Sequence, residues 1–326
     1  MPADLSNDEL IGILERMILI REFEERAATL MEQNRIPGAV HLYVGEEAVG
    51  VGVCSNLTDN DYITSTHRGH GHLLAKGGDP KQMYAELLGR VDGYCKGKGG
   101  SMHVADLDIG MLGANGIVGA GPPIAMGAAF ASKYRDDGNV SVVFFGDGAS
   151  NQGTFHEAAN MASLYKLPLI LCCENNLYGE FTRQADHQAV KDVADRAGGY
   201  NMPGIVVDGM DVMAVREAAG EAIARARRGE GPTLLECKTY RFYDHVGRDF
   251  GILKRDEEEV AHWRSRDPIQ AFQATLVDQN VITTGDTEAL TEKIRARIDE
   301  AVEYAEASPE PDRSVLLDDV YTEATV

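Results

Sequence analysis

The chain has 326 residues, of which 44% are hydrophobic, and this length suffices for one large domain with a buried core. Its formal net charge of -21 argues against nucleic acid as a partner, because such binding requires clustered Lys and Arg. Five cysteines without a Cys-x-x-Cys pair, an acidic N-terminus unlike a targeting peptide, and no apolar run near the roughly 18 residues of a membrane span predict a cytoplasmic protein without membrane attachment.

The N-terminal part begins with a predicted amphipathic helix. Between Asn7 and about Asn34, apolar residues recur mostly at spacings of three and four, as on one helix face. The following region, 36–121, is rich in Gly and His and contains one helical patch at 79–88 between irregular stretches. Gly-rich loops of this kind usually let the backbone approach a ligand or another chain, so this region is a candidate binding region.

The middle of the chain alternates between helical and strand patterns. A helical run follows Pro123, and apolar strands are predicted at 140–145 and 168–173 with a helix at 151–165 between them. Further on, strands at 204–207 and 232–239 flank a helix at 211–228. This order predicts an α/β fold with a central parallel sheet flanked by helices.

The C-terminal part is predicted to be a loop at 240–255, which contains Gly, His and Arg, followed by helices near 268–278 and 286–307. The predicted organisation has three parts: an N-terminal helical segment at 1–35, an α/β domain at 36–265, and a C-terminal helical extension at 266–326.

Polar residues follow two neighbouring strands of the predicted sheet. Asp147 comes directly after the strand that ends at Phe145, between Gly146 and Gly148, and Asn175-Asn176 follow the next strand. Because the carboxyl ends of parallel strands lie at one edge, these side chains should lie together. Asp and Asn oxygens suit Mg²⁺, which also takes phosphate oxygens, and the next helix would offer N–H groups to the anion. The sequence therefore predicts a metal-bridged diphosphate site.

Less specific interpretations exist for each motif. Gly-Asp-Gly and Asn-Asn are common in turns, but their matched positions after two strands favour a ligand role. The loop Gly97-Lys-Gly-Gly-Ser101 lacks the spacing of a P-loop, because Gly rather than Ser or Thr follows Lys98. Gly119-Ala-Gly121 has Ile124 where a dinucleotide fingerprint requires Gly or Ala, so an NAD site is not expected.

Several sequence blocks resemble one enzyme family. Gly146-Asp-Gly148 with Asn175-Asn176 resembles the thiamine diphosphate motif, and the blocks His41-Leu-Tyr-Val-Gly-Glu-Glu, Ser65-Thr-His-Arg-Gly-His-Gly-His72 and Gly97-Lys-Gly-Gly-Ser-Met-His103 are similar to those of alpha subunits of thiamine diphosphate-dependent 2-oxo acid and acetoin dehydrogenases. The resemblance covers about 41–268 and leans toward the acetoin branch at His67, where pyruvate enzymes often have Tyr. It implies a thiamine diphosphate-binding fold.

The resemblance also implies roles for individual residues. Metal ligation is implied for Asp147, Asn176 and the carbonyl of Tyr178. Cofactor binding is implied for His67, Arg68, Gly116, Val118, Asp147, Gly148, Ala149, Asn176 and His245. Active-site histidines are implied at His41, His70 and His245. One departure is Asp244-His245-Val246 in place of the usual Gly-His-Ser, which removes a hydroxyl that relatives phosphorylate and adds a carboxylate beside the presumed site.

The resemblance implies an oxidoreductase subunit that uses thiamine diphosphate and Mg²⁺ to cleave acetoin, or to decarboxylate pyruvate or another 2-oxo acid. In this family a beta subunit supplies a glutamate, the assembly is an α2β2 heterotetramer, and the acyl group passes to a lipoyl-bearing acyltransferase. The alternatives are a stand-alone thiamine diphosphate-dependent decarboxylase or ligase, and a metal-dependent nucleotide-binding α/β module. The chain carries only one Gly-Asp-Gly with its Asn pair, which disfavours a self-sufficient enzyme.

Overall fold

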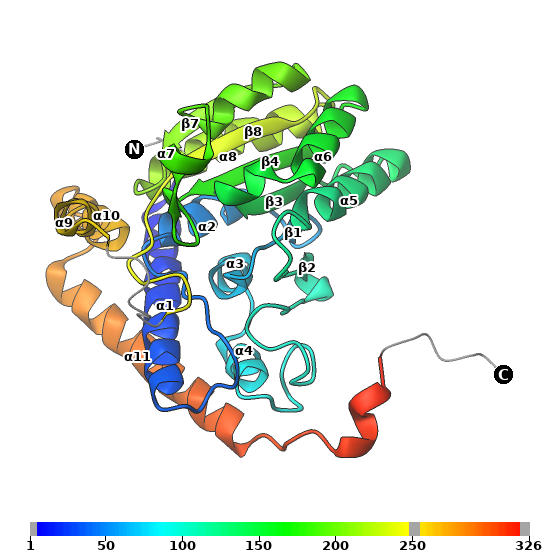
Figure 1. The fold of residues 1–326 in the computed structure, drawn as a ribbon. Coiled ribbons are helices and arrows are strands. Elements are labelled where there is room, and N and C mark those ends of the chain that lie inside the picture. Colours follow the sequence, from blue (N-terminus) through cyan, green and yellow to red (C-terminus); the bar gives the residue numbers. More distant parts are fainter. Residues whose placement is uncertain (1–4, 248–254, 320–326) are drawn as a thin grey trace.

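The computed structural model describes residues 5–247 and 255–319, and its centre is a six-stranded parallel sheet (Figure 1). The strand order is β2-β1-β3-β4-β8-β7. The strands are β1 (Tyr62–Thr64), β2 (Met111–Gly113), β3 (Ser141–Gly146), β4 (Leu169–Asn175), β7 (Gly204–Asp208) and β8 (Thr233–Lys238). The predicted strands at 140–145, 168–173, 204–207 and 232–239 are therefore confirmed, whereas β1 and β2 come from the region predicted as irregular.

The central strands β3, β4 and β8 are buried, which explains why they are mostly apolar, whereas the edge strand β7 is partly exposed. Successive residues of a strand point to opposite faces, so Val142 and Phe144 of β3 belong to one hydrophobic cluster, while Val143 and Phe145 belong to another. Helices α5 (Gly121–Arg135) and α6 (Gly153–Leu164) cover the second face. Both helices contribute mainly alanines to this cluster, and small side chains allow close packing on the sheet.

The first face is covered by a larger group of helices: α1 (Asn7–Glu32), α2 (Glu47–Cys54), α3 (Gly69–Lys76) and α8 (Val212–Arg227). The other α-helices are α4 (Pro80–Leu87), α7 (Gln184–His187), α9 (Glu257–Arg264), α10 (Pro268–Asp278) and α11 (Thr284–Ala307). Short elements complete the chain: 3-10 turns η1 (Leu107–Ile109), η2 (Gly148–Asn151), η3 (Val193–Tyr200) and η4 (Arg313–Leu317), with the small hairpin β5 (Tyr178–Gly179) and β6 (Thr182–Arg183).

Seven helices are confirmed from the sequence pattern, namely α1, α4, α5, α6, α8, α10 and α11. Helices α2, α3, α7 and α9 were not predicted. The helix expected to begin at 151 instead starts as the turn η2 and becomes α-helical at Gly153. The expected loop at 240–255 is described at 240–247 and 255, while residues 1–4, 248–254 and 320–326 of the predicted segments lie outside the described residues.

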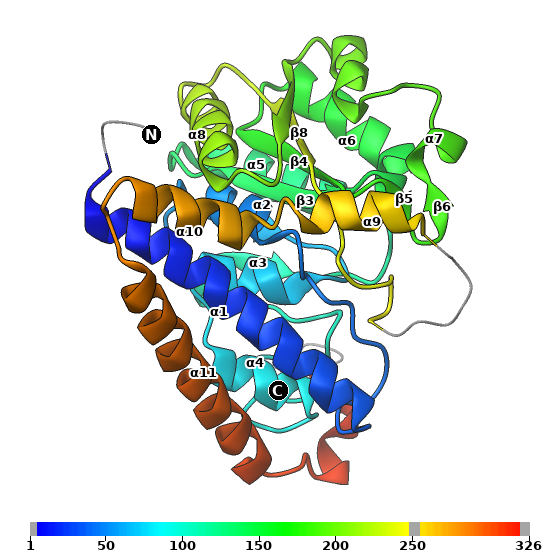
Figure 2. The ribbon, with the colours of Figure 1, turned by 90° about the vertical axis from the view of Figure 1, so that its left-hand side faces the viewer.

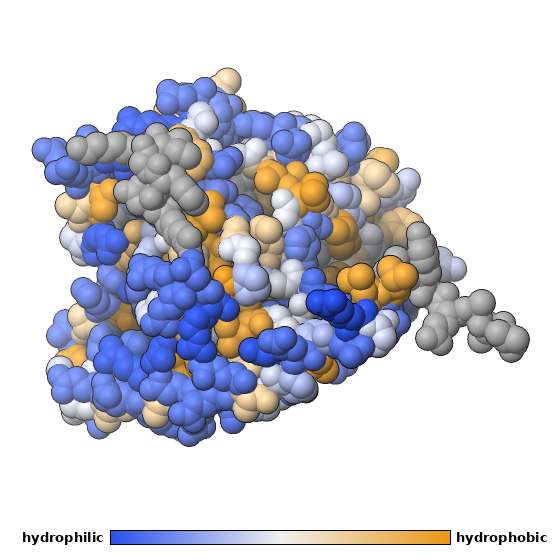
Figure 3. Space-filling view, turned by 60° about the horizontal axis from the view of Figure 1, so that its bottom comes forward, coloured by the Kyte–Doolittle hydropathy of each residue, from blue (hydrophilic) through white to orange (hydrophobic). Residues whose placement is uncertain are grey.

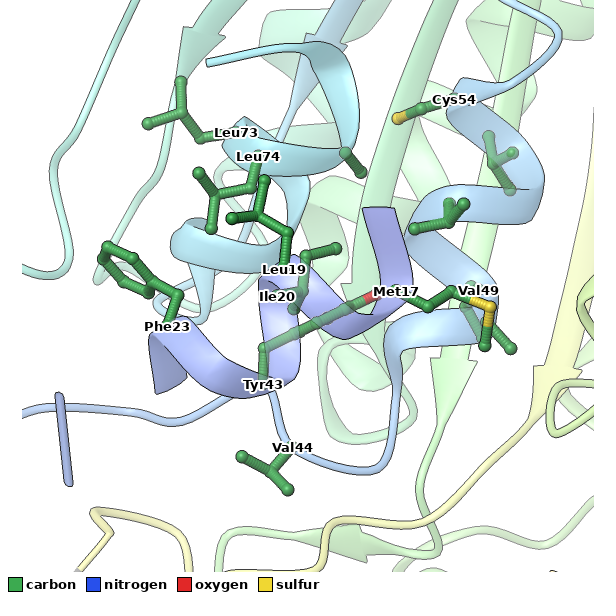
Figure 4. Packing of buried hydrophobic residues seen from close by; sticks show 14 of the residues in the cluster. Met17, Leu19, Ile20, Phe23, Tyr43, Val44, Val49, Cys54, Leu73 and Leu74 are labelled. Atoms are coloured by element: carbon green, nitrogen blue, oxygen red, sulfur yellow. The ribbon is translucent and has the colours of Figure 1, made fainter. Parts of the chain in front are cut away.

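Helix α1 packs between the C-terminal helix α11 and helix α3, which lies on the sheet. Figure 2 shows it beside α11, and Figure 4 shows its residues Ile20 and Phe23 near Leu73 and Leu74 of α3. One hydrophobic cluster contains residues of α1, α3 and the sheet together with Ile298 of α11. The three predicted segments therefore share a continuous core, and a boundary at 35/36 or 265/266 stays a prediction.

A capping box begins helix α1. The Ser6 hydroxyl accepts a hydrogen bond from the backbone N–H of Glu9 at 3.3 Å, and the Glu9 carboxylate accepts one from the backbone N–H of Ser6 at 2.8 Å. We expect Ser6→Ala to lower the free energy of unfolding by about 1 kcal/mol, because an N–H group of the first turn loses its partner. Urea denaturation measures this, and an unchanged midpoint would contradict it. Ser55→Ala, at the C-terminal end of α2, is a control for loss of a hydroxyl elsewhere.

The surface carries apolar side chains in separate patches among hydrophilic ones, as the face in Figure 3 shows. Exposed large apolar residues of the described chain include Leu107, Ile117, Phe130, Tyr134 and Leu164. Within the described residues, every helix is too short or too polar to cross a bilayer.

Candidate active site

A cavity of about 410 Å³ lies at the carboxyl edge of the sheet, where β1, β3 and β4 end. Its walls include Ser65 to Arg68 after β1, Gly146 to Ala149 at and after β3, and Glu174 and Asn176 at the end of β4. In the sheet register Gly146 is opposite Glu174, so the polar residues that follow are neighbours. The predicted meeting of Asp147 and Asn176 at one edge is confirmed.

The three residues expected to ligate a metal all line the cavity. Asp147 and Asn176 are buried, and Tyr178 follows on the turn after β4. The Asn176 amide donates to the Glu46 carboxylate at 3.0 Å, and its oxygen accepts from the backbone N–H of Tyr178 at 3.3 Å. These bonds fix which way the amide points. Asp147 accepts a hydrogen bond from the His187 ring at 3.0 Å. The result is a set of oxygen donors suited to a hard cation.

Glycine at position 148 permits a close approach of two backbone segments. A Cβ at Gly148 would lie 3.2 Å from the Cα of Gly179, on the turn that carries Tyr178. The Gly-Asp-Gly motif therefore packs directly against the second half of the site. Gly148 and Ala149 both line the cavity, as predicted for backbone contacts to a diphosphate.

Basic side chains also line the cavity. Arg68 is buried and donates to the carbonyl oxygens of Leu42 and His245, each at 2.9 Å. Burial and the neighbouring Arg241 lower the pKa of Arg68 to about 9, so its guanidinium remains charged near neutral pH. His67 and His245 line the cavity beside it, with ring centroids 5.1 Å apart.

The histidines near Arg68 stay neutral. Burial and the Arg68 charge lower the pKa of His67 and His245 well below the usual range and lower that of His41 to about 3. His41 is not a lining residue, but its ring lies 4.6 Å from His67 and 5.1 Å from His245. These rings therefore offer neutral hydrogen-bond donors and acceptors to a ligand.

His70 lies apart from the cavity. It is completely buried, with Nδ1 at 3.1 Å from the Glu24 carboxylate of α1 and Nε2 at 2.9 Å from the Ser101 hydroxyl. The structure thus places it between a helix and the Gly-rich loop rather than at the site. Gly116 also falls outside the lining of the cavity. Its neighbours Asn115 and Ile117 line the cavity, and Val118 lines it as predicted.

The lining residues that were not identified from the sequence include three ionisable ones, Glu46, His187 and Arg241. Burial and the nearby Glu174 raise the pKa of Glu46. Arg241 is buried, and its Nη1 has no hydrogen-bond partner among the described residues. Asp244, expected to add a carboxylate here, forms an ion pair with Arg255 at 3.3 Å.

Known proteins resemble this chain over nearly its whole length. The family model described as Dehydrogenase E1 component matches residues 15–314. The acetoin:2,6-dichlorophenolindophenol oxidoreductase subunits alpha of Bacillus subtilis and Cupriavidus necator are 50% and 47% identical, each over 97% of this chain and 95% of the relative. Chloroplastic pyruvate dehydrogenase E1 component subunit alpha-3 of Arabidopsis thaliana is 44% identical over 98% of this chain and 76% of its own length. This chain belongs to the dehydrogenase E1 component family.

Proposed function

We propose that this chain is the thiamine diphosphate-binding alpha subunit of a two-subunit dehydrogenase that acts on acetoin, pyruvate or another 2-oxo acid. The observation that carries the proposal is one cavity lined by both buried oxygen donors and buried arginines. Relatives named as alpha subunits of acetoin and pyruvate enzymes support both the reaction class and a beta subunit as partner.

The metal that this site would hold is Mg²⁺. Asp147, the Asn176 side-chain oxygen and the Tyr178 carbonyl are hard ligands, and Mg²⁺ completes its octahedron with phosphate oxygens and water. Because the Asn176 amide nitrogen donates to Glu46, the amide oxygen points the other way; it accepts from the backbone N–H of Tyr178 and keeps a second lone pair for a metal. The donor set thus fits a metal that bridges the protein and a diphosphate.

The arginines of the cavity fit the negative charge of the diphosphate. Arg68 and Arg241 are both buried there, and the Nη1 of Arg241 is a donor without an acceptor among the residues that the structure describes. Such a group is costly to bury unless a ligand supplies that acceptor. His67 and His245, with the backbone of Gly148 and Ala149, would supply further contacts.

Bound thiamine diphosphate would supply the carbon nucleophile and the electron sink for cleaving a bond beside a carbonyl group. The residues of this chain would hold and orient it, and His41 and His245 would accept or donate protons at the substrate. The acyl product would pass to a lipoyl-bearing acyltransferase. The cavity is lined by both acidic and basic side chains, so its charge does not distinguish neutral acetoin from anionic 2-oxo acids as substrates.

Arg241 provides a test of anion binding at the cavity. We expect Arg241→Met to weaken thiamine diphosphate binding roughly 10- to 100-fold, because a hydrogen bond to a charged group contributes about 1.5–3 kcal/mol. Calorimetric titration with the cofactor and excess Mg²⁺ measures this. Arg228→Met, which removes an exposed arginine paired with Glu230, is the control. Equal affinities of the two variants would contradict a role for Arg241.

The function is tested by thermal shift and turnover. We expect thiamine diphosphate with Mg²⁺ to raise the melting temperature, whereas ATP and NAD with Mg²⁺ leave it unchanged. Stabilisation by ATP alone would instead support a nucleotide-binding module. Acetoin, pyruvate and other 2-oxo acids are then compared as substrates of the α–β mixture by reduction of 2,6-dichlorophenolindophenol, and the lipoyl acyltransferase is added as a separate acceptor.

A further inference from the structure

The side chains of the segment from His67 to His72 point in two directions. His67 and Arg68 line the cavity, whereas His70 and His72 are completely buried within the protein. Each of the two buried histidines is the centre of a Ser–His–Glu chain. Ser65–His72–Glu174 lies between α3 and the sheet, and Ser101–His70–Glu24 lies between α3 and α1.

The bonds of His72 define its protonation pattern. Its Nε2 lies 2.9 Å from the Glu174 carboxylate, which can only accept, so Nε2 carries the proton. Its Nδ1 lies 2.7 Å from the Ser65 hydroxyl, which lies 3.4 Å from its other acceptor, the Thr66 carbonyl. The shorter distance favours donation from Ser65 to His72. The Tyr43 hydroxyl donates to the same Glu174 oxygen.

Packing fixes the His72 ring in this position. It stacks on Phe144 with centroids 3.9 Å apart and an interplanar angle of 22°, and it meets the edge of the Tyr43 ring at 4.7 Å. A Cβ at Gly71 would lie 2.0 Å from the Tyr43 ring, so glycine is needed for α3 to approach so closely. The imidazole is thus held by hydrogen bonds at both nitrogens and by rings on two sides.

Ser65 and Glu174, the two partners of His72, line the cavity, although His72 itself does not. Phe144 lines it as well. The Glu174 carbonyl oxygen accepts a hydrogen bond from the backbone N–H of Asn176 at 3.1 Å, and the Asn176 amide donates to Glu46 at 3.0 Å. Hydrogen bonds therefore connect His72 to Glu174, and Glu174 to the residue that would ligate the metal.

We propose that His72 is a positioning residue for the metal–diphosphate site: it anchors Ser65 and Glu174 in the cavity walls and so holds Asn176, whose backbone N–H donates to the Glu174 carbonyl, in place. This role rests on the proposed function, because Asn176 is a metal ligand only if the cofactor binds there. Partners behind metal ligands typically change metal affinity about 10- to 100-fold when they are replaced.

The second Ser–His–Glu chain supplies a matched control. Ser101, His70 and Glu24 have the same types of bonds, but none of them lines the cavity. Ser65→Ala and Ser101→Ala therefore remove equivalent hydroxyls, one connected to the site and one remote from it. Both variants keep their histidines, which limits the damage to folding.

The test uses the full chain mixed with its beta subunit. We expect His72→Phe, which retains ring packing but loses both hydrogen bonds, to weaken Mg²⁺–thiamine diphosphate binding about 10- to 100-fold by calorimetry. At saturating cofactor its kcat should change less than about twofold, because only binding is affected. His72→Gln, whose amide can donate to Glu174, should recover most of the affinity, and Ser65→Ala should weaken binding more than Ser101→Ala.

The outcomes separate this role from the proposed function. If wild-type protein binds thiamine diphosphate and His72→Phe binds it equally well, the role of His72 is wrong and the function stands. If the affinity loss is the same in His72→Phe and His72→Gln, the ring rather than the hydrogen bonds matters, and the role is also wrong. If His72→Phe does not fold, His72→Gln and the two serine variants decide. Wild-type protein that binds no thiamine diphosphate would contradict the function and, with it, this role.

Discussion

Asp147→Asn is expected to abolish detectable binding of thiamine diphosphate with Mg²⁺. Asp147 is the charged member of the proposed ligand set, and it is buried at the cavity. The substitution keeps the shape of the side chain but removes the negative charge that the cation needs. The loss should exceed the roughly 10- to 100-fold effect of replacing a residue behind the ligands.

Thermal stabilisation gives a direct measure of this loss. At a cofactor concentration about 100 times its Kd, wild-type protein gains about 2.7 kcal/mol of stability, and Asp147→Asn should gain none. Asp137→Asn makes the same chemical change in the exposed loop before β3 and should retain the full gain. Equal stabilisation of both variants by cofactor would place the metal elsewhere.

The metal-binding part of the site is predictable from sequence because its signals are local. Asp147 and Asn176 each follow a strongly apolar strand, and parallel strands bring their carboxyl ends to one edge. The central strands and the long helices are predictable for the same reason, since their apolar residues recur with a clear period. The contacts of Gly148 with Gly179 then explain why glycine flanks Asp147.

Helix α3 escaped prediction because its sequence opposes the helical signal. Gly69 and Gly71 lower intrinsic helix propensity, but a Cβ at either position would lie 2.5 Å or less from Ala114 or Tyr43. Tertiary packing therefore outweighs propensity here. Helix α3 also explains why His70 lies away from the cavity. Side chains two residues apart on a helix point in different directions, so His70 cannot face the cavity that Arg68 lines.

Arg241 and His187 could not be identified because no local pattern marks them. Arg241 follows strand β8, and His187 ends the short helix α7. Both residues line the cavity although they lie far along the chain from Arg68. Glu46 stood within a recognised block, yet its role depends on its distance to Asn176, 130 positions away. Such long-range contacts are properties of the fold rather than of spacing.

Turnover is expected to require the beta subunit, and this follows from how the cavity is built. Ile117 and Val118 belong to its lining, yet they are 72% and 51% exposed. Apolar side chains at the mouth of a binding site are typical of surfaces that a partner covers. Among the cavity carboxylates, Asp147 and Glu174 accept hydrogen bonds from His187 and His72, and Glu46 accepts one from Asn176 through a single oxygen.

A glutamate from the beta subunit would therefore supply proton transfer to the cofactor, as the family resemblance implies. General acid–base catalysis contributes about 10²- to 10⁴-fold, and we expect at least that rise in dye reduction when beta is added to alpha. Ile117→Asp should reduce the rise in dye reduction that beta produces, because it places a charge in the covered surface. The fold of alpha alone, measured by circular dichroism, should not change. Comparable turnover from purified alpha without any partner would show instead that this chain completes its own site.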